Sequence, residues 1–264
     1  MRILVANDDG YKAKGLHELV EILRPYGHLT VVSPKFHQSG MSMAVNLGGK
    51  PIAVKKLSEE DGVSYWYVDG TPSSCVKFGI DNILPDSLPE LVVSGINHGA
   101  NYGTAALYSG TLGAATEAAL AGIRSVAVSL DCFDPDADFS AIRKYFPPLL
   151  DQILALKNVP YGVLYNINFP NIPVDEIKGV RVCRQGILHW EREFQPFPFD
   201  TLHDEGEELY QMVGDVVSDP ANADDADHLL IRKGYITVVA HNLDNTDYAH
   251  ARQLRESGLE KDFR

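Results

Sequence analysis

Long apolar runs and clustered cysteines are missing from this chain. No segment reaches the ~18 consecutive apolar residues that a membrane-spanning helix needs, so we expect no membrane protein. The N-terminus enters a strand-like run at residues 3–6 directly, without the apolar stretch and cleavage site of a signal peptide. The cysteines Cys75, Cys132 and Cys183 are far apart, which excludes a CxxC metal knuckle or a disulfide framework. Reduced thiols and a cytoplasmic location are therefore expected.

Positive charge is also scarce. Lys and Arg number 23 against 36 Asp and Glu, a formal net charge of -13. Such a surface repels nucleic-acid backbones and argues against a protein that coats DNA or RNA. A small phosphorylated substrate is still compatible with this charge, because a bound cation reverses the local electrostatic field. The first strand is not followed by Gly-x-Gly-x-x-Gly, so a dinucleotide-binding oxidoreductase is poorly supported.

The first half of the chain alternates short apolar runs with helical patterns. This alternation predicts a Rossmann-like, three-layer α/β/α fold with a mostly parallel sheet. Ligands in such folds bind beyond the carboxyl ends of the strands. The strand-like runs are residues 2–6, 29–32, 91–94 and 125–129, a hairpin is expected at 51–56 and 64–68, and the helical patterns are 16–23, 111–121 and a helix starting at Thr71.

The second half is less regular. We expect a core domain over residues 1–240 and a C-terminal tail over 241–264, with a hairpin and helix extension that serves oligomerisation and a tail that is exchanged between subunits. The further expectations are a helix at 139–156 with a kink or break at Pro147 and Pro148, a strand at 163–167, irregular chain at 183–214, a surface loop at 215–227, a last strand at 235–240 and a short polar helix at 248–257.

Two adjacent carboxylates, Asp8 and Asp9, carry the strongest local signal. They follow the first strand within Asn7-Asp8-Asp9-Gly10 and repel each other. A hard divalent cation is the usual way to offset that repulsion. The same four residues also suit a plain turn, so both readings are open at this point.

Three further loops favour a cation site over a plain turn. Each of them follows a strand or begins a helix. Ser39 and Gly40 come after the second strand, and Gly70-Thr71-Pro72 presents free backbone N–H groups at a helix start. Residues 94–101 (SGINHGAN) end the strand at 91–94 with two asparagines and a histidine, and residues 108–111 (YSGT) open the next helix. Neutral Asn oxygens suit a hard cation, and the helix start suits a phosphate.

Together these pieces resemble the SurE (survival protein E) family of 5'/3'-nucleotidases. Its hallmarks are an N-terminal NDDG, an SG loop near residue 40, a helix opened by GTP, an SGxNxGxN loop and a YSGT helix start, and all five occur here in order. Residues 165–170 (YNINFP) and 234–238 (GYITV) look like two later strands of the family. The resemblance covers about residues 1–240.

The resemblance implies a chemistry and a set of residues. One divalent cation per subunit, Mg²⁺ or Mn²⁺, would support hydrolysis of nucleoside 5'- and 3'-monophosphates, with other phosphoesters or short polyphosphate as further substrates. A cation-activated water would attack phosphorus, and homodimers or homotetramers are expected. The implied cation ligands are Asp8, Asp9, Ser39 and Asn97, the phosphate-binding residues Ser39, Gly40, Asn97, Asn101, Ser109, Gly110 and Thr111, and the catalytic residues Asp8, Asp9, Asn101 and Ser109.

The chain departs from the family pattern at two places. Ser73 and Ser74 stand where many members have an Ala-Asp pair, and residues 194–204 are unlike the family's Arg- and Tyr-rich hairpin. These departures bear on assembly and on base specificity. His98, beside Asn97, is a candidate acid, although a histidine at a strand end is more often a structural hydrogen-bonding residue.

Two other functions compete with the nucleotidase. An aspartyl-phosphate phosphatase would use Asp8 as a nucleophile, but such enzymes carry an Asp-x-Asp spacing, and here the carboxylates are adjacent. A nucleotide-binding sensor without turnover would use the same loops, yet it has no need for two carboxylates that repel a phosphate.

Overall fold

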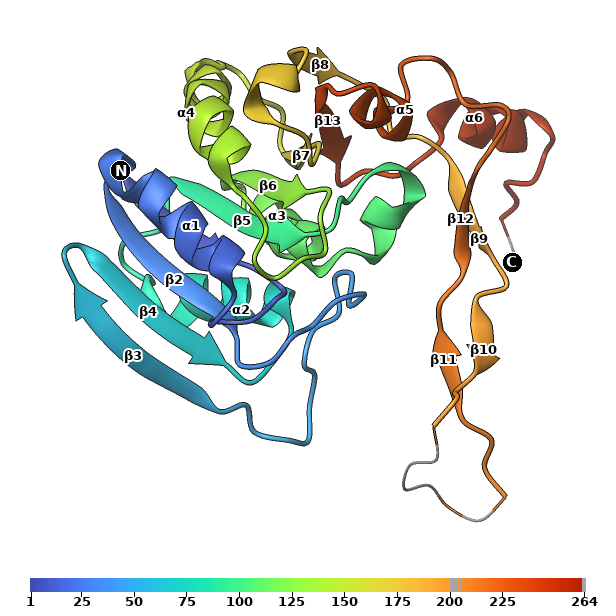
Figure 1. The fold of residues 1–264 in the computed structure, drawn as a ribbon. Helices are drawn as coiled ribbons and strands as arrows, with labels where there is room; N and C mark the ends of the chain where they lie inside the picture. The colour runs from blue at the N-terminus through green and yellow to red at the C-terminus, as the bar shows by residue number, and fades with distance from the viewer. Residues whose placement is uncertain (200–203, 205, 263–264) are drawn as a thin grey trace.

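A mostly parallel sheet forms the centre of the molecule, as the alternating pattern predicted (Figure 1). The computed structural model describes residues 1–199, 204 and 206–262. Within these residues one nine-stranded sheet has the order β3-β4-β2-β1-β5-β6-β7-β13-β8, and β3, β13 and β8 run opposite to the rest. The strands are β1 (Arg2–Ala6), β2 (His28–Pro34), β3 (Val54–Glu60), β4 (Val63–Val68), β5 (Leu91–His98), β6 (Arg124–Leu130), β7 (Val163–Phe169), β8 (Val180–Val182) and β13 (Ile236–Asn242).

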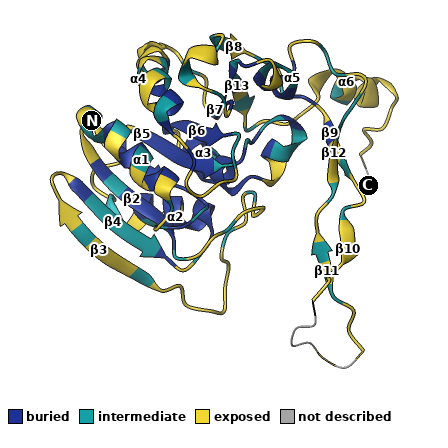
Figure 2. Ribbon diagram, in the orientation of Figure 1, coloured by how far each residue is buried: buried dark blue, intermediate teal, exposed yellow. Residues whose placement is uncertain are grey.

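Helices cover both faces of the sheet, which gives the three layers. On one face α1 (Lys14–Leu23) and α4 (Ser140–Ala155) share a core with Ile3 and Val5 of β1. On the other face α2 (Pro72–Phe78) and α3 (Gly110–Leu120) surround Leu4 and Ala6, because successive side chains of a strand point to opposite faces. Figure 2 shows the resulting buried centre. Short helical turns are η1 (Arg24–Tyr26), η2 (Gly79–Ile83), η3 (Gly103–Tyr108) and η4 (Val174–Glu176).

The order of the strands brings the polar loops together. β1 lies between β2 and β5 and is parallel to both. The segments that follow these three strands therefore leave the same edge of the sheet, starting at residues 7, 35 and 99. The predicted hairpin is confirmed as β3 and β4, which pair in antiparallel fashion away from this edge.

Helix α4 runs unbroken through Pro147 and Pro148, so of the expected kink or break the break is wrong. Its buried side chains Ile142, Phe146 and Leu150 follow one another at intervals of four residues across the two prolines. Proline removes the N–H that would pair with the carbonyl four residues earlier. Those carbonyls belong to exposed residues in the first half of the helix, where water can donate hydrogen bonds to them. Burial of the apolar stripe stabilises the helix.

A two-stranded arm projects from the sheet between residues 188 and 218 (Figure 1). The expectations of irregular chain at 183–214 and of a loop at 215–227 are wrong here, because four short strands pair along the arm and a helix begins at Asp227. The elements are β9 (Leu188–Glu191) with β12 (Asp215–Ser218), β10 (Phe194–Pro196) with β11 (Tyr210–Met212), and α5 (Asp227–Arg232). Strands of three or four residues whose side chains are mostly exposed or half-buried show no alternation of hydrophobicity that a sequence pattern could reveal (Figure 2).

The departure from the family hairpin includes β10 of this arm. Of residues 194–204, positions 200–203 lie outside the described residues. Phe194 at the start of β10 is 66% exposed.

The C-terminal segment matches the expected strand and polar helix. β13 extends to Asn242 and pairs antiparallel with β7. Helix α6 (Tyr248–Glu256) is capped by Asp247, whose carboxylate accepts from the His250 N–H at 2.9 Å, and it has no buried residue. An exchange of this tail between subunits stays a prediction, and residues 263–264 lie outside the described residues. No helix among the described residues is long and apolar enough to cross a membrane.

The core on the α4 face generates a stability prediction. Phe146 is fully buried among α1, α4 and the sheet, so Phe146→Ala is expected to lower the free energy of unfolding by about 3–5 kcal/mol. Urea denaturation with a linear extrapolation measures this change. Phe36→Ala is the matched control, because Phe36 is 60% exposed, and equal losses in the two variants would contradict the assigned core.

Candidate active site

Asp8 is buried against the first turn of α3. Its carboxylate accepts from the Thr111 hydroxyl at 2.5 Å and from the Thr111 backbone N–H at 3.2 Å, and the residue is 3% exposed. A Cβ on Gly110 would lie 3.0 Å from the Asp8 Cβ, so only glycine allows this approach without a shift. The N-terminus of a helix favours a negative charge, which fits the position of Asp8.

Asp9 faces two histidines. Its Oδ2 accepts from the His98 backbone N–H at 3.2 Å and lies 3.1 Å from His98 Nδ1. Its Oδ1 lies 3.3 Å from Nδ1 of His37. His98 is therefore a neighbour that positions Asp9, and its ring edge rests on Phe139. His37 was missed at the sequence level, because nothing about a histidine in a polar loop indicates that it meets Asp9.

Burial changes the acidity of Asp8. Desolvation, and after it the charge on Asp9, raise the pKa of Asp8 from 3.8 to about 6, and the hydrogen bond from Thr111 only partly offsets this. Two ionised carboxylates at this site are costly unless a positive charge joins them. This is the electrostatic demand that the adjacent aspartates implied from the sequence.

The loop after β2 runs from Asp8 across to α3. The Gln38 N–H donates to the Asp8 carbonyl at 2.7 Å, and the Ser42 N–H donates to the Tyr108 carbonyl at 2.9 Å. Between these two anchors Ser39 and Gly40 are exposed. Ser39 lines a cavity of about 680 Å³ that also has Asp9, His37, His98, Lys12 and Lys14 in its wall.

Ser74, a departure from the family pattern, helps to hold this loop. Its hydroxyl accepts from the Asn46 N–H at 3.1 Å and donates to the Asn46 side-chain oxygen at 3.0 Å. The Thr71 N–H donates to the same oxygen at 3.0 Å, and the Thr71 hydroxyl donates to the Ala44 carbonyl at 2.6 Å. The helix start at Thr71 and Pro72 is thus an anchor for the far end of the loop.

Asn97 and Asn101 are oriented by different partners. The Asn97 side-chain N–H donates to the Gly99 carbonyl at 2.6 Å, and no donor among the described residues occupies its side-chain oxygen. The Asn101 side-chain N–H donates to the Ser129 hydroxyl at 2.9 Å, while Asn166 and Asn168 bind its backbone. Asn101 is therefore tied to the ends of β6 and β7. Its predicted contact with phosphate stays a prediction.

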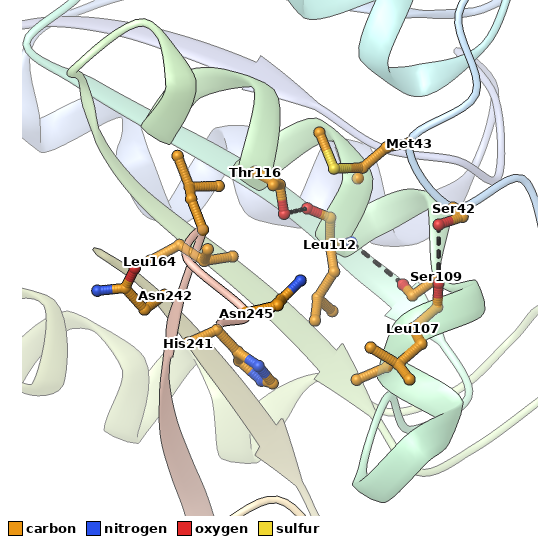
Figure 3. Close-up of a pocket in the computed structure, with 13 residues that line it drawn as sticks. Ser42, Met43, Leu107, Ser109, Leu112, Thr116, Leu164, His241, Asn242 and Asn245 are labelled. Carbon is orange, nitrogen blue, oxygen red and sulfur yellow. Dashed lines mark hydrogen bonds between the residues drawn. The ribbon is translucent and has the colours of Figure 1, made fainter. Parts of the chain in front are cut away.

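Ser109 is the N-cap of α3. Its hydroxyl accepts from the Leu112 N–H at 3.1 Å, which leaves the hydroxyl hydrogen free to donate (Figure 3). Gly110, the next residue, packs against Asp8. Thr111 donates hydrogen bonds to Asp8 from its hydroxyl and its backbone N–H. The structure therefore gives Thr111 a role in holding Asp8, while the assignment of Ser109 and Gly110 to a phosphate pocket stays a prediction.

Asp227 is a buried carboxylate that the sequence did not reveal. It accepts from the Gly103 N–H at 2.9 Å and from the Gly186 N–H at 3.0 Å, and it is fully buried. Gly103 lies two residues after Asn101, and Gly186 lies at the root of the arm. Thr104 adds a second link, because its hydroxyl accepts from the Leu188 N–H at 3.0 Å. The arm is thus fastened to the segment between Asn101 and Ser109.

The donor chemistry around Asp8 and Asp9 fits a hard cation. Among the described residues no three His, Cys, Asp or Glu side chains form a group that could hold a metal ion by themselves, so any cation here would combine two carboxylates with neutral oxygens. Ser39, in the wall of the Asp9 cavity, and Asn97 are the neutral ligands that the family resemblance implied, and that assignment stays a prediction. All-oxygen ligation suits Mg²⁺ or Mn²⁺ rather than a thiolate-seeking ion.

Comparisons with known proteins agree with the motifs. The family model described as "Survival protein SurE" matches residues 3–192. A protein named 5'-nucleotidase SurE from Phocaeicola vulgatus is 36% identical over 258 residues, covering 98% of this chain and 97% of the relative. The protein of the same name from Syntrophobacter fumaroxidans is 38% identical over 255 residues, covering 94% and 96%. The crystal structure of the SurE protein from Aquifex aeolicus has a TM-score of 0.80 at 29% identity, covering 98% of this chain and 100% of that one.

The raised pKa of Asp8 generates a pH prediction for the cation-free protein. Because Asp8 binds its proton more tightly when folded, this proton stabilises the folded state below about pH 4, and the stabilisation is lost as the pH rises through about 6. The difference between the two pKa values corresponds to a loss of roughly 3 kcal/mol in the free energy of unfolding. Urea unfolding between pH 4 and 7.5, with chelator, is expected to show this loss in the wild type. Asp8→Asn should flatten it, and identical pH profiles would contradict the burial argument.

The clamp formed by Asp227 generates a second stability prediction. Asp227→Ala leaves the buried N–H groups of Gly103, Gly186 and His228 without this acceptor, and the expected loss of unfolding free energy is about 3 kcal/mol. Asp224→Ala is the matched control, because Asp224 is exposed in the same segment. Urea denaturation compares the two variants. Equal stabilities would show that the Gly103 and Gly186 amides find other partners.

Proposed function

The chain belongs to the SurE family, and we propose that it is a 5'-nucleotidase, an enzyme that hydrolyses nucleoside 5'-monophosphates to a nucleoside and inorganic phosphate. The observation that carries the proposal is the Asp8–Asp9 pair at the carboxyl end of β1, packed on the first turn of α3. Carboxylates in this position repel a phosphate by themselves. They become useful for phosphate chemistry when a cation joins them.

A divalent cation is therefore part of the proposal. Asp8, Asp9, Ser39 and Asn97 would hold one Mg²⁺ or Mn²⁺ per subunit. When bound, such an ion neutralises charge on the phosphoryl group and lowers the pKa of water. The raised pKa of Asp8 supports this assignment, since the protein without the ion carries an uncompensated negative site.

The chain's own residues have separate tasks in this scheme. Thr111 holds the Asp8 carboxylate through its hydroxyl and its N–H, which leaves Asp9 as the carboxylate that orients a water or removes its proton. His37, from the loop after β2, and His98, the last residue of β5, face Asp9 and keep its oxygens in place. The Ser109 hydroxyl and the N–H groups at the start of α3 would stabilise the negative oxygens of the phosphoryl group in the transition state. Lys12 and Lys14 border the Asp9 cavity and offset the net negative surface for an incoming phosphate.

The finer parts of the function are proposals of the same kind. We expect activity on 3'-monophosphates, and on other phosphoesters or short polyphosphate, because the cation site contacts only the phosphoryl group. Homodimers or homotetramers that use the C-terminal extension are expected. A cytoplasmic location agrees with the cysteines of the described chain, which are all unpaired.

The decisive experiment replaces Asp9. Asp9→Ala is expected to lower the turnover of AMP by about three orders of magnitude or more, because it removes a cation ligand and the carboxylate nearest to an attacking water. Phosphate release is measured with Mn²⁺ or Mg²⁺ and again with excess chelator. The chelator should abolish release by the wild type.

Asp86→Ala serves as the matched control, since Asp86 is exposed far from the site in sequence and should leave activity unchanged. Full activity of Asp9→Ala would refute the mechanism. Tight nucleotide binding by the wild type without phosphate release would favour a sensor, and a trapped phosphoenzyme would favour an aspartyl-phosphate phosphatase that uses Asp8.

A further inference from the structure

A row of aromatic side chains lies on the α1 side of the β3–β4 hairpin. Tyr65 and Tyr67 are two residues apart on β4, so both side chains point to the face of the sheet that α1 partly covers. Tyr11, which precedes α1, packs on Tyr67 with ring centroids 5.5 Å apart, and His17 of α1 packs on Tyr65 at 6.0 Å. The four rings are half-buried or exposed. They therefore keep surface that a ligand can reach.

A cavity of about 270 Å³ lies along this row, between α1 and the hairpin (Figure 1). Its wall on the side of β3, the edge strand of the sheet, consists of Leu57 and Ser58. The pairing of β3 with β4 shifts at Leu57, and the Leu57 side chain is 38% exposed. The cavity and the row of rings together form what we call the aromatic groove. The other residues that line the cavity are Tyr11, Lys12, His17 and Tyr65.

Lysine side chains are interspersed with these rings. Lys12 Nζ lies 5.5 Å from the centre of the Tyr11 ring, and Lys35 Nζ lies 5.8 Å from the centre of the Tyr67 ring. Lys55 of β3 pairs with Tyr67 across the hairpin, so its exposed side chain is on the same face. Rings on which bases stack, combined with positive charges that follow the phosphates, are typical of sites for single-stranded nucleic acid.

The distribution of charge favours a short strand. Near Tyr67 the groove carries three lysines, and of these Lys35 is paired with Asp69 at 3.3 Å. At the opposite end Glu60 closes β3 and Asp61 follows in the turn. Phosphate groups are therefore attracted to one half of the groove and repelled from the other. The net charge of -13 argues against a protein that coats nucleic acid, yet it is compatible with a short strand at a local positive patch.

Lys12 connects the aromatic groove to the carboxylate site, because its side chain lines both this cavity and the Asp9 cavity. The register of β1, β2 and β4 places Tyr67 level with Asn7, the residue before Asp8. Two strand spacings separate β4 from β1, a lateral distance of about 10 Å. Both cavities also border the first turn of α1. One short strand can thus have its end at the carboxylates and its next nucleotides in the groove.

We infer that the aromatic groove binds the nucleotides that follow the phosphorylated end of a short single-stranded oligonucleotide. The inference rests on the proposed function and extends its substrates from mononucleotides to 5'-phosphorylated oligonucleotides. Bases stack on Tyr11 and Tyr67, and the phosphodiester groups face Lys12 and Lys35. A water oxygen forms the new bond to the terminal phosphorus, the bond from phosphorus to the 5' oxygen breaks, and that oxygen takes a proton from the water. The phosphodiester bonds stay intact.

Rates of the wild type on AMP and on 5'-phosphorylated triadenylate provide the first test. We expect kcat/KM for triadenylate to exceed that for AMP about threefold or more, because binding energy from the remote nucleotides adds to transition-state stabilisation. It should also fall more steeply with salt, since lysine contacts to phosphates release counterions. A kcat/KM for triadenylate that does not exceed that for AMP would overturn the inference.

Leu57→Asp places a negative charge in the groove without changing the carboxylate site. It is expected to lower kcat/KM for triadenylate about fivefold or more, while kcat/KM for AMP changes by less than about twofold. Leu88→Asp is the matched control, because Leu88 is 50% exposed and lies before β5, outside the groove. Equal losses on triadenylate in the two variants would contradict the groove.

A second variant tests stacking separately from charge. Tyr67→Leu keeps apolar bulk on the hairpin and removes the ring, so KM for triadenylate is expected to rise about fivefold or more with little change in KM for AMP. Tyr67→Phe keeps the ring and should match the wild type. Unchanged triadenylate kinetics in both Leu57→Asp and Tyr67→Leu would overturn the inference. Equal losses on AMP and triadenylate would overturn it as well.

Failure of the proposed function can be told apart from failure of this inference. If the wild type hydrolyses AMP and not triadenylate, the proposed function stands and the inference is wrong. If it releases no phosphate from any ester, the proposed function is wrong, and fluorescence anisotropy with 5'-phosphorylated, 3'-fluorescein-labelled pentaadenylate then tests the groove. Weaker binding by Leu57→Asp than by Leu88→Asp would support the groove. Equal affinities, or no binding by the wild type, would refute it.

Discussion

The contact between Asp8 and the first turn of α3 is the constraint on which the rest of the site depends. A buried carboxylate at the end of β1 requires donors, and Thr111 supplies two of them. The helix can come this close only because Gly110 has no side chain. The same contact fixes where Ser109 lies relative to the sheet, so the geometry of the helix start and of the aspartate pair is set by one interaction. Burial and the neighbouring charge of Asp9 still raise the pKa of Asp8, and a cation would relieve this.

Loops around this contact are held by buried polar side chains rather than by apolar packing. Asn166 and Asn168 at the end of β7 bind the backbone of Asn101. Asp227 binds Gly103 and the root of the arm. A hydrogen-bonded polar group under a loop fixes its backbone more specifically than apolar contact does, because leaving such a group unpaired is costly. The arm and the loop that carries Ser109 are therefore parts of one network, although they lie about 80 residues apart in sequence.

Most of the central fold follows from patterns in the sequence. The parts that could not be predicted have a physical reason in each case. Strands such as β1 and β5 are buried on both faces, so they appear in the sequence as continuous apolar runs. The polar residues that follow them predict that Asp8, Asp9 and Asn97 lie at the same edge of the sheet. The arm has no such pattern, because its short strands are exposed. The prolines of α4 mislead for the opposite reason, since burial of Phe146 outweighs two lost hydrogen bonds. His37 and Asp227 were not recognisable, because their roles come from partners distant in the chain.

The separation of charge around the site has a consequence for specificity. A phosphoryl group is common to every phosphomonoester, so the Asp9 side, with its lysines, attracts all of them in the same way. Discrimination has to come from a surface that contacts the alcohol part and gains free energy only from particular shapes. The loop from Gln38 to Asn46 carries Ser39 in the wall of the Asp9 cavity and Ser42 and Met43 in the wall of an uncharged cavity beside Ser109. Because that loop is anchored at Asp8, at Tyr108 and at Thr71, the position of Ser39 in the Asp9 cavity depends on all three anchors.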